Sequence, residues 1–109
     1  MLVDQRTYTL KLGTVREFLT LYAREGLPVQ VQHLGAPLGF YTTETGELNQ
    51  VVHCWQYQDM ADRERRRSAL EADVRWLAYR QKSTAQGQLL SQHVLLLRSV
   101  DLAALAASV

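Results

Sequence analysis

The sequence has a single cysteine, almost no net charge and no long apolar run. Since Cys54 has no partner for an intrachain disulfide, we expect a reducing compartment. The formal net charge of +1 gives no overall attraction to nucleic acid or to an anionic membrane. No apolar stretch approaches the ~20 residues that a membrane helix requires, and no basic segment followed by an apolar stretch opens the chain. These absences predict a cytoplasmic protein with no membrane span and no nucleic-acid partner.

Motifs for metal, phosphate and covalent catalysis are also missing. The three histidines, His33, His53 and His93, lie far apart, and no HxH, HExxH or CxxC pair occurs. We therefore expect no dedicated metal site and no bound cofactor, although a haem held by one axial histidine stays open. The six glycines are dispersed instead of forming a phosphate-binding loop, and no Gly-x-Ser-x-Gly sequence is present.

The residues that are present predict one folded α+β domain. Hydrophobic residues make up 47% of the chain and charged residues 21%, a balance typical of folded proteins. Runs rich in β-branched and aromatic residues predict four strands, at residues 2–10, 38–44, 48–57 and 89–98. Helical patterns fill the two long intervals between them. The order β-α-β-β-α-β is that of a ferredoxin-like fold, with a four-stranded antiparallel sheet and helices on one face.

Capping residues predict where the helices begin and end. Residues Thr14–Glu17 form a capping-box sequence at the start of the first helix. Gly26 is the expected end of that helix, and Pro28 suits the first turn of a second one. Asp59 and Asp73 are the expected N-caps of the two helices that follow the third strand.

The fourth strand suggests how the molecule assembles. Residues Val94–Leu97 place apolar side chains on both faces of this strand, whereas helices can bury only one face. A homodimer that packs sheet against sheet and closes a barrel between subunits would cover the other face. The alternative is an edge strand with a few exposed leucines. The expected domain spans residues 1–98, and residues 99–109 form an Ala/Leu-rich tail with one or two helical turns.

Alternating residues on two strands predict a binding site. One face of the first strand carries Asp4, Arg6 and Tyr8, and one face of the third carries His53 and Trp55. These strands are neighbours in the ferredoxin-like order. If both sets face the barrel, they line a pocket with a guanidinium, an imidazole and aromatic rings. Such a pocket suits a planar, partly apolar ligand with a carboxylate or enolate. The expected ligand-binding residues are Arg6, Tyr8, Tyr41, His53 and Trp55.

The same cluster has a catalytic and a structural interpretation. His53 could act as a general base near neutral pH while Arg6 stabilises the developing negative charge. Alternatively, Arg6 pairs with Asp4 or another carboxylate, and His53 makes a satisfied structural hydrogen bond.

Two further features are interpreted as structural. Cys54 points away from His53, so we expect a small buried residue between the strand and the helices. The basic run Arg63–Arg67 is preceded by Asp59 and Asp62, each four residues before an arginine. This spacing predicts helical ion pairs on a solvated face and not a phosphate-binding surface.

Several segments resemble the NIPSNAP family. Arg6–Gly13 is similar to its opening strand and turn, Leu34–Glu44 and Gly46–Tyr57 to its central hairpin, and Ala61–Arg67 to the start of its second helical region. The most specific part is Leu-Asn-x-Val-Val-His-x-Trp at residues 48–55. The resemblance covers about residues 2–98 and implies the dimeric α/β-barrel superfamily.

The resemblance implies little chemistry, because the family has no generally agreed activity and its superfamily includes enzymes and regulators. Our leading hypothesis is a homodimer that binds a small hydrophobic or aromatic molecule in its barrel. One alternative is a cofactor-independent monooxygenase or isomerase that uses His53 and Arg6. Another is a protein-interaction module that recruits a partner through its helices or tail.

Overall fold

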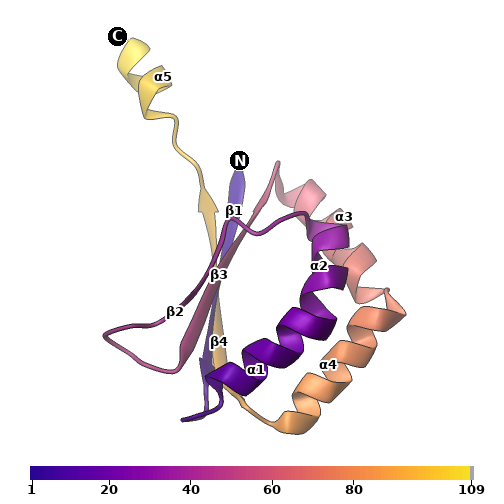
Figure 1. Ribbon diagram of the computed structural model, residues 1–109. Helices are drawn as coiled ribbons and strands as arrows, with labels where there is room; N and C mark the ends of the chain where they lie inside the picture. Colours follow the sequence, from indigo (N-terminus) through magenta and orange to yellow (C-terminus); the bar gives the residue numbers. More distant parts are fainter. Residues whose placement is uncertain (109) are drawn as a thin grey trace.

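The computed structural model describes residues 1–108 as a sheet with one helical layer (Figure 1). In chain order, the elements are β1 (Leu2–Leu10), α1 (Val15–Leu21), the π-helical turn η1 (Tyr22–Gly26), α2 (Leu27–Leu34), β2 (Gly39–Thr42), β3 (Gln50–Tyr57), α3 (Met60–Glu71), α4 (Val74–Gln86), β4 (Leu89–Arg98) and α5 (Leu102–Ala107). The sheet has the order β2-β3-β1-β4, and every pairing is antiparallel. The predicted ferredoxin-like α+β fold is confirmed.

The register places β1 between β3 and β4. Arg6 lies opposite His53 on β3 and opposite Val94 on β4. Residues directly opposite on antiparallel strands share a face of the sheet. The middle of β1 therefore brings a guanidinium, an imidazole and an apolar side chain to the same face.

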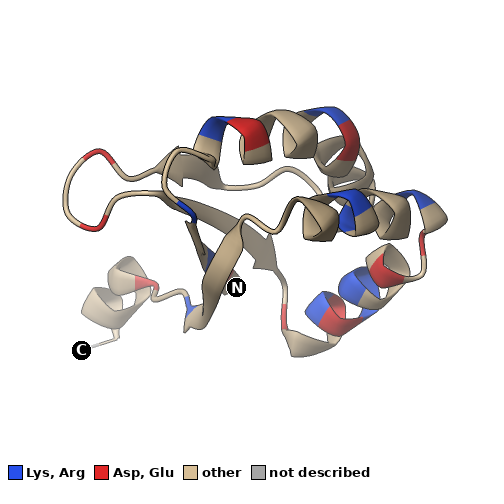
Figure 2. Ribbon diagram, turned by 90° about the horizontal axis from the view of Figure 1, so that it is seen from below, with Lys and Arg blue, Asp and Glu red and all other residues tan. Residues whose placement is uncertain are grey.

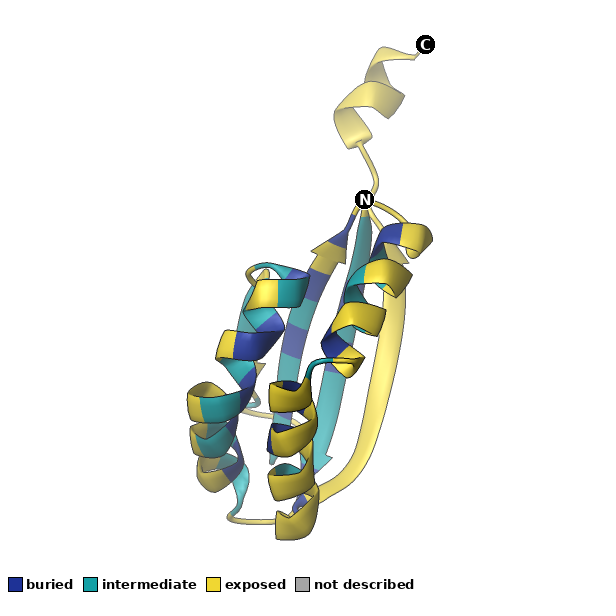
Figure 3. Cartoon of the chain, turned by 90° about the vertical axis from the view of Figure 1, so that its right-hand side faces the viewer, coloured by how far each residue is buried: buried dark blue, intermediate teal, exposed yellow. Residues whose placement is uncertain are grey.

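The helices cover one face of the sheet but leave β4 clear. Figure 3 shows the helices in front of the sheet, with β4 as an exposed strand at its edge. The buried hydrophobic core therefore lies between the helices and the strands β1 and β3. On β4, Val94 and Leu96 face the helix side, whereas Leu95 and Leu97 face the open side. All four are exposed in the single chain.

The first helical segment corrects two predictions. The Thr14 hydroxyl donates to the Lys11 carbonyl at 2.7 Å and forms no cap, so the capping-box prediction is wrong. Gly26 does not end the helix, because α1, η1 and α2 follow one another without a break. A Cβ atom at Gly26 would lie 3.0 Å from the rings of Tyr22 and Tyr79. Glycine is therefore needed there for close packing and not for termination.

The later caps follow the predictions. Asp59 accepts from the backbone amide of Asp62 at 2.8 Å, and Asp73 accepts from that of Arg75 at 2.9 Å. In the tail, α5 projects away from the sheet (Figure 1). Val109, the last residue of the predicted tail, lies outside the described residues. Within residues 1–108, no helix combines the length and the apolar character needed to span a bilayer.

A buried carboxylate links the sheet to α3. Asp4 is fully buried and accepts from Arg6 Nη1 at 3.3 Å and from Arg63 Nε at 3.0 Å. Arg63 was expected to pair with Asp59 on a solvated face, and this prediction is wrong because the Asp59 carboxylate caps the helix. The predicted Asp62–Arg66 pair is present at 2.9 Å. Figure 2 shows that most charged residues lie on the helices; among the described strand residues, Asp4 and Arg6 are charged and buried, whereas Arg98 is exposed.

We expect Asp4→Asn to destabilise the protein by about 3 kcal/mol, because it removes the carboxylate that neutralises two largely buried guanidiniums. Urea denaturation would measure the loss. Glu25→Gln is the matched control, because it breaks the exposed pair with Lys82 and should cost less than about 1 kcal/mol. Equal losses in the two variants would contradict a structural role for the Asp4 network.

Candidate functional site

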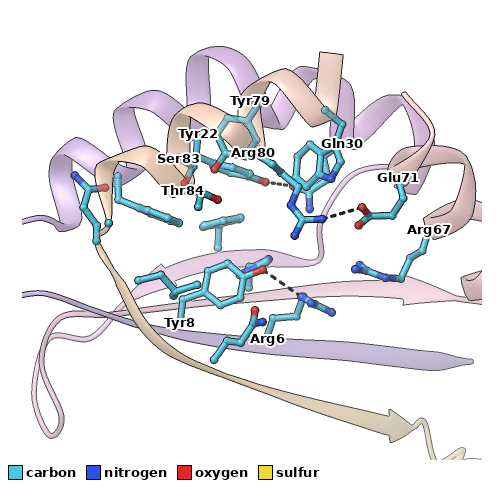
Figure 4. A pocket seen from close by; sticks show the side chains of 18 residues that line it. Arg6, Tyr8, Tyr22, Gln30, Arg67, Glu71, Tyr79, Arg80, Ser83 and Thr84 are labelled. Carbon is cyan, nitrogen blue, oxygen red and sulfur yellow. Dashed lines mark hydrogen bonds and ion pairs between the residues drawn. The ribbon is translucent and has the colours of Figure 1, made fainter. Parts of the chain in front are cut away.

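A cavity of about 490 Å³ lies between the sheet and the helices of a single subunit (Figure 4). Tyr8 and His53 line it from the sheet, and Tyr22, Trp76 and Tyr79 line it from the helices. The walls are therefore mainly aromatic. Four of the five side chains predicted as a site, Arg6, Tyr8, His53 and Trp55, lie on the face of the sheet that the helices cover.

This location corrects the expected orientation of the strands. The face that carries His53 also carries the large side chains of Trp55 and Tyr57, which are almost fully buried. Burying these rings requires the helices, so the whole face turns toward them. Cys54 consequently points to the open face of the sheet and is partly exposed. The expectation that Cys54 lies between the strand and the helices is wrong.

Three of the five predicted ligand-binding residues line the cavity, namely Arg6, Tyr8 and His53. Trp55 is fully buried and supports the cavity wall, because its Nε1 donates to His53 Nδ1 at 2.7 Å. Tyr41 is 58% exposed and does not line the cavity. Its neighbour Phe40 lies opposite His53 in the register and lines the cavity instead.

The environment of His53 determines its protonation state. The ring is stacked on Phe40 with centroids 4.6 Å apart and lies edge-on to Tyr8 at 4.9 Å. Burial, followed by the positive charge of Arg6, lowers the pKa of His53 from 6.5 to about 4, so the imidazole is neutral at pH 7. Since Nδ1 accepts from Trp55, the proton must be on Nε2.

The Nε2–H group of His53 is one of two buried unpaired donors on the cavity-lining side chains of residues 1–108, the other being Trp76 Nε1. His53 is 1% exposed, and its Nε2 atom has no hydrogen-bond partner among residues 1–108. A buried donor without a partner is costly, and such groups often mark functional positions. The structural interpretation of His53 therefore accounts for only one ring nitrogen. Nδ1 accepts from Trp55, whereas Nε2 has no partner among residues 1–108.

Arg6 lies beside His53 and is only partly neutralised. Its guanidinium donates to Asp4 at 3.3 Å and to the Tyr8 hydroxyl at 3.4 Å. Burial alone would lower the pKa of Arg6, but Tyr8 and Asp4 raise it above its ordinary value, so the group stays charged. Because Asp4 also pairs with Arg63, one carboxylate balances two cations. The cavity thus has an excess of positive charge at this position.

The π-helical turn η1 positions the opposite wall. Tyr22, its first residue, points its ring toward the cavity and donates from its hydroxyl to Gln30 Oε1. Burial raises the pKa of Tyr22, so the phenol stays neutral. A single π-turn inside a helix is often found at a functional site. In the sequence, Val15, Phe18, Leu19 and Tyr22 have the i, i+3, i+4, i+7 spacing of a helix face, but nothing in that spacing indicates a π-turn.

Charged groups gather toward one end of the cavity. Figure 4 shows Arg67 and Glu71 at this end, with Ser83 and Thr84 toward the other. Glu71 pairs with Arg80 at 2.8 Å, whereas Arg67 has no ion-pair partner among residues 1–108.

Arg67 was expected on a solvated face, and its position in the cavity wall corrects that prediction. The spacing of Arg63, Arg67 and the buried Leu70 at i, i+4 and i+7 could have revealed this inner face. No group of three or more His, Cys, Asp or Glu side chains suitable for a metal ion occurs in the described part of the chain.

Comparisons with known proteins agree on the family. The NIPSNAP family model matches residues 3–104. A mouse protein, NipSnap homolog 3B, is 35% identical over 72 residues, which cover 65% of this chain. The matched region is only 28% of the length of that curated relative.

Solved structures with the same architecture include NIPSNAP proteins and more distant enzymes. An uncharacterised NIPSNAP domain protein from Burkholderia xenovorans is 36% identical, with a TM-score of 0.86 over 92% of this chain and 95% of its own. A NIPSNAP family protein from Agrobacterium tumefaciens is 33% identical, with a TM-score of 0.86 over 92% and 93%. An antibiotic biosynthesis monooxygenase is 14% identical, with a TM-score of 0.61 over 93% and 100%, a likeness of fold alone.

We expect His53 to stay neutral, with its proton on Nε2, until the pH falls to about 4. Because the unfolded chain binds this proton near pH 6.5, stability should rise with pH between about 4 and 6.5, by about 3 kcal/mol in total. Nitrogen NMR would report the tautomer and the titration, and His53→Phe should remove this part of the pH dependence of unfolding. Protonation of His53 near pH 6.5 in the folded protein would contradict the assignment.

Proposed function

The chain belongs to the NIPSNAP family, and we propose that it binds a small hydrophobic or aromatic molecule carrying an anionic group. The observation that carries the proposal is the unpaired Nε2–H of His53, beside Arg6 in an aromatic cavity. The volume of about 490 Å³ is within the range of small-molecule sites.

The anionic group is inferred from the charges around the cavity. Among residues 1–108, Arg6, Arg67 and Arg80 line it, against one lining carboxylate, Glu71. Arg80 is neutralised by Glu71, and Arg6 shares Asp4 with Arg63. A carboxylate or enolate could accept from His53 Nε2–H and from guanidinium donors, an arrangement that is stronger than neutral hydrogen bonding.

Binding without turnover fits His53 better than general-base catalysis. A general base needs a free lone pair and a pKa near the working pH. In the neutral tautomer the only in-plane lone pair of His53 accepts from Trp55, and its pKa is about 4. The alternative of a cofactor-independent monooxygenase or isomerase would require His53 to release Trp55 first. We therefore assign His53 the role of a hydrogen-bond donor.

The proposed assembly is a homodimer formed through the open face of the sheet. Leu95 is 54% exposed and Leu97 42% exposed on that face in the single chain. Val3 lies opposite Leu97 on the neighbouring strand β1, and Val52 lies on the same face on β3; both are partly exposed. An exposed apolar surface of this kind favours association with a second copy.

The tail supports a second candidate function in protein interaction. Leu102 is 73% exposed and Leu105 60% exposed on α5, which projects from the end of β4. A helix this short is marginal in water without a packing surface. This candidate and the ligand-binding proposal can both apply to one protein. We propose the cytoplasm as the location, because the single Cys54 suits a reducing compartment.

We expect wild-type protein to bind phenylpropanoate and Arg67→Gln to weaken that binding about tenfold, because the cavity wall loses a positive charge that acts on the His53 position. Isothermal titration calorimetry would measure both affinities. Arg65→Gln is the matched control, because Arg65 lies on the same helix with a 72% exposed side chain. Equal losses in the two variants, or equally tight binding of the neutral amide of phenylpropanoate, would argue against an anion site.

We also expect light scattering after gel filtration to give about twice the 12.4 kDa mass of one chain. The double variant Leu95→Lys/Leu97→Lys should elute as a monomer, because it places charges in the proposed interface. Leu12→Lys, at an 86% exposed loop position, should leave the dimer intact. A wild-type monomer at micromolar concentration would refute the proposed assembly.

A further inference from the structure

Gln88 lines the cavity but does not contribute to the proposed anion site. Gln88 is 4% exposed and lines the cavity, and its Oε1 atom has no hydrogen-bond partner among residues 1–108. A buried amide oxygen normally accepts at least one hydrogen bond. Gln88 therefore presents an unused acceptor to the cavity, just as His53 presents an unused donor.

The backbone holds Gln88 near the far end of the cavity. Gly87 ends α4 in the left-handed conformation with φ 63°, and the Gln88 carbonyl accepts from the Lys11 amide at 2.9 Å. This hydrogen bond ties Gln88 to the residue just after β1. Because Arg6 and Lys11 are five residues apart on an extended chain, their Cα atoms are roughly 16 Å apart. Gln88 and the Arg6 guanidinium thus lie at well-separated positions along the cavity.

The chemistry around Gln88 differs from that around Arg6. The charged lining residues are Arg6, Arg67, Glu71 and Arg80, and Glu71 is already paired with Arg80. Ser83 and Thr84 supply hydroxyls, which can donate or accept and so do not select one type of ligand group. The side-chain oxygen of Gln88, Oε1, can only accept a hydrogen bond. With no free carboxylate beside it, this end suits a neutral donor better than a cation.

Resting on the proposed function, we infer that the cavity selects an elongated ligand with an anion at the Arg6–His53 position and a neutral hydrogen-bond donor at Gln88. An aromatic ring with a short acidic chain on one side and a hydroxyl on the other has this form. The ring lies among the aromatic walls, the acid accepts from Arg6 and His53, and the hydroxyl donates to Gln88 Oε1. A ligand without the hydroxyl leaves that buried oxygen unpaired, which a polar site penalises strongly.

The test compares three acids that share the same anion and ring: phenylpropanoate, para-hydroxyphenylpropanoate and para-methoxyphenylpropanoate. Calorimetry on the wild-type protein should give about tenfold tighter binding of the hydroxy acid than of the parent. The methoxy acid should gain nothing, because an ether oxygen cannot donate. These ratios test the inference in the wild-type protein, so they do not depend on how a variant folds.

Gln88→Met keeps the length of the side chain but removes the acceptor, so the ratio between the hydroxy acid and the parent should fall to about one. Gln86→Met, at an exposed position near the end of α4, is the control and should keep the tenfold ratio. Equal binding of the hydroxy acid and the parent to wild-type protein would overturn this inference and leave the proposed function intact. Preferential binding of the methoxy acid would also overturn the inference. The same holds if Gln88→Met keeps the wild-type ratio between the affinities for the hydroxy acid and the parent acid. If none of the acids binds, the proposed function and this inference both fail.

Discussion

The alternation of side chains along β3 is the constraint on which the rest of the structure depends. Trp55 and Tyr57 require burial under the helices, and the two-residue repeat of a strand carries His53 to the same side. The neighbouring strand brings Asp4 and Arg6 to that side as well. Burying the large rings therefore forces polar groups into the interior, where each must find a partner.

Most of these buried polar groups have hydrogen-bond partners within the chain, and the groups without a partner define the candidate site. Asp4 binds two guanidiniums, and His53 accepts from Trp55. His53 Nε2 and Gln88 Oε1 have no such partner in the described residues, and both residues line the same cavity. Trp76 Nε1 is likewise unpaired and its residue also lines the cavity, so three of the four buried unpaired side-chain atoms in the described residues, all but Tyr57 Oη, belong to residues around a space where a small molecule could bind.

The fold could be read from the sequence because local patterns determined it. The Asp59 and Asp73 caps and the limits of β1 and β4 follow from short-range chemistry. The choice of sheet face was not local, because it depended on whether helices or a second subunit covered Trp55. Tyr41 and Phe40 show the same effect, since a shift of one residue exchanged the exposed ring for the lining one. Gln88 was missed because its role comes from tertiary placement, whereas Arg67 was missed although its helical spacing to the buried Leu70 indicated an inward face.

The π-helical turn has a consequence for how such a chain can change during evolution. A π-turn winds one residue more than an α-turn into about one full turn of helix, so the extra residue is absorbed locally and the segments on either side keep their phase. The buried Phe18 of α1 and the buried Val29 and Leu34 of α2 can therefore all pack inward, although η1 separates them. The loss of one residue within residues 22–26 would convert η1 into an α-turn and leave Val29 and Leu34 buried, but it would change the part of the cavity wall that Tyr22 forms. Lineages can thus change the shape of the cavity at this turn while they keep the helical frame around it.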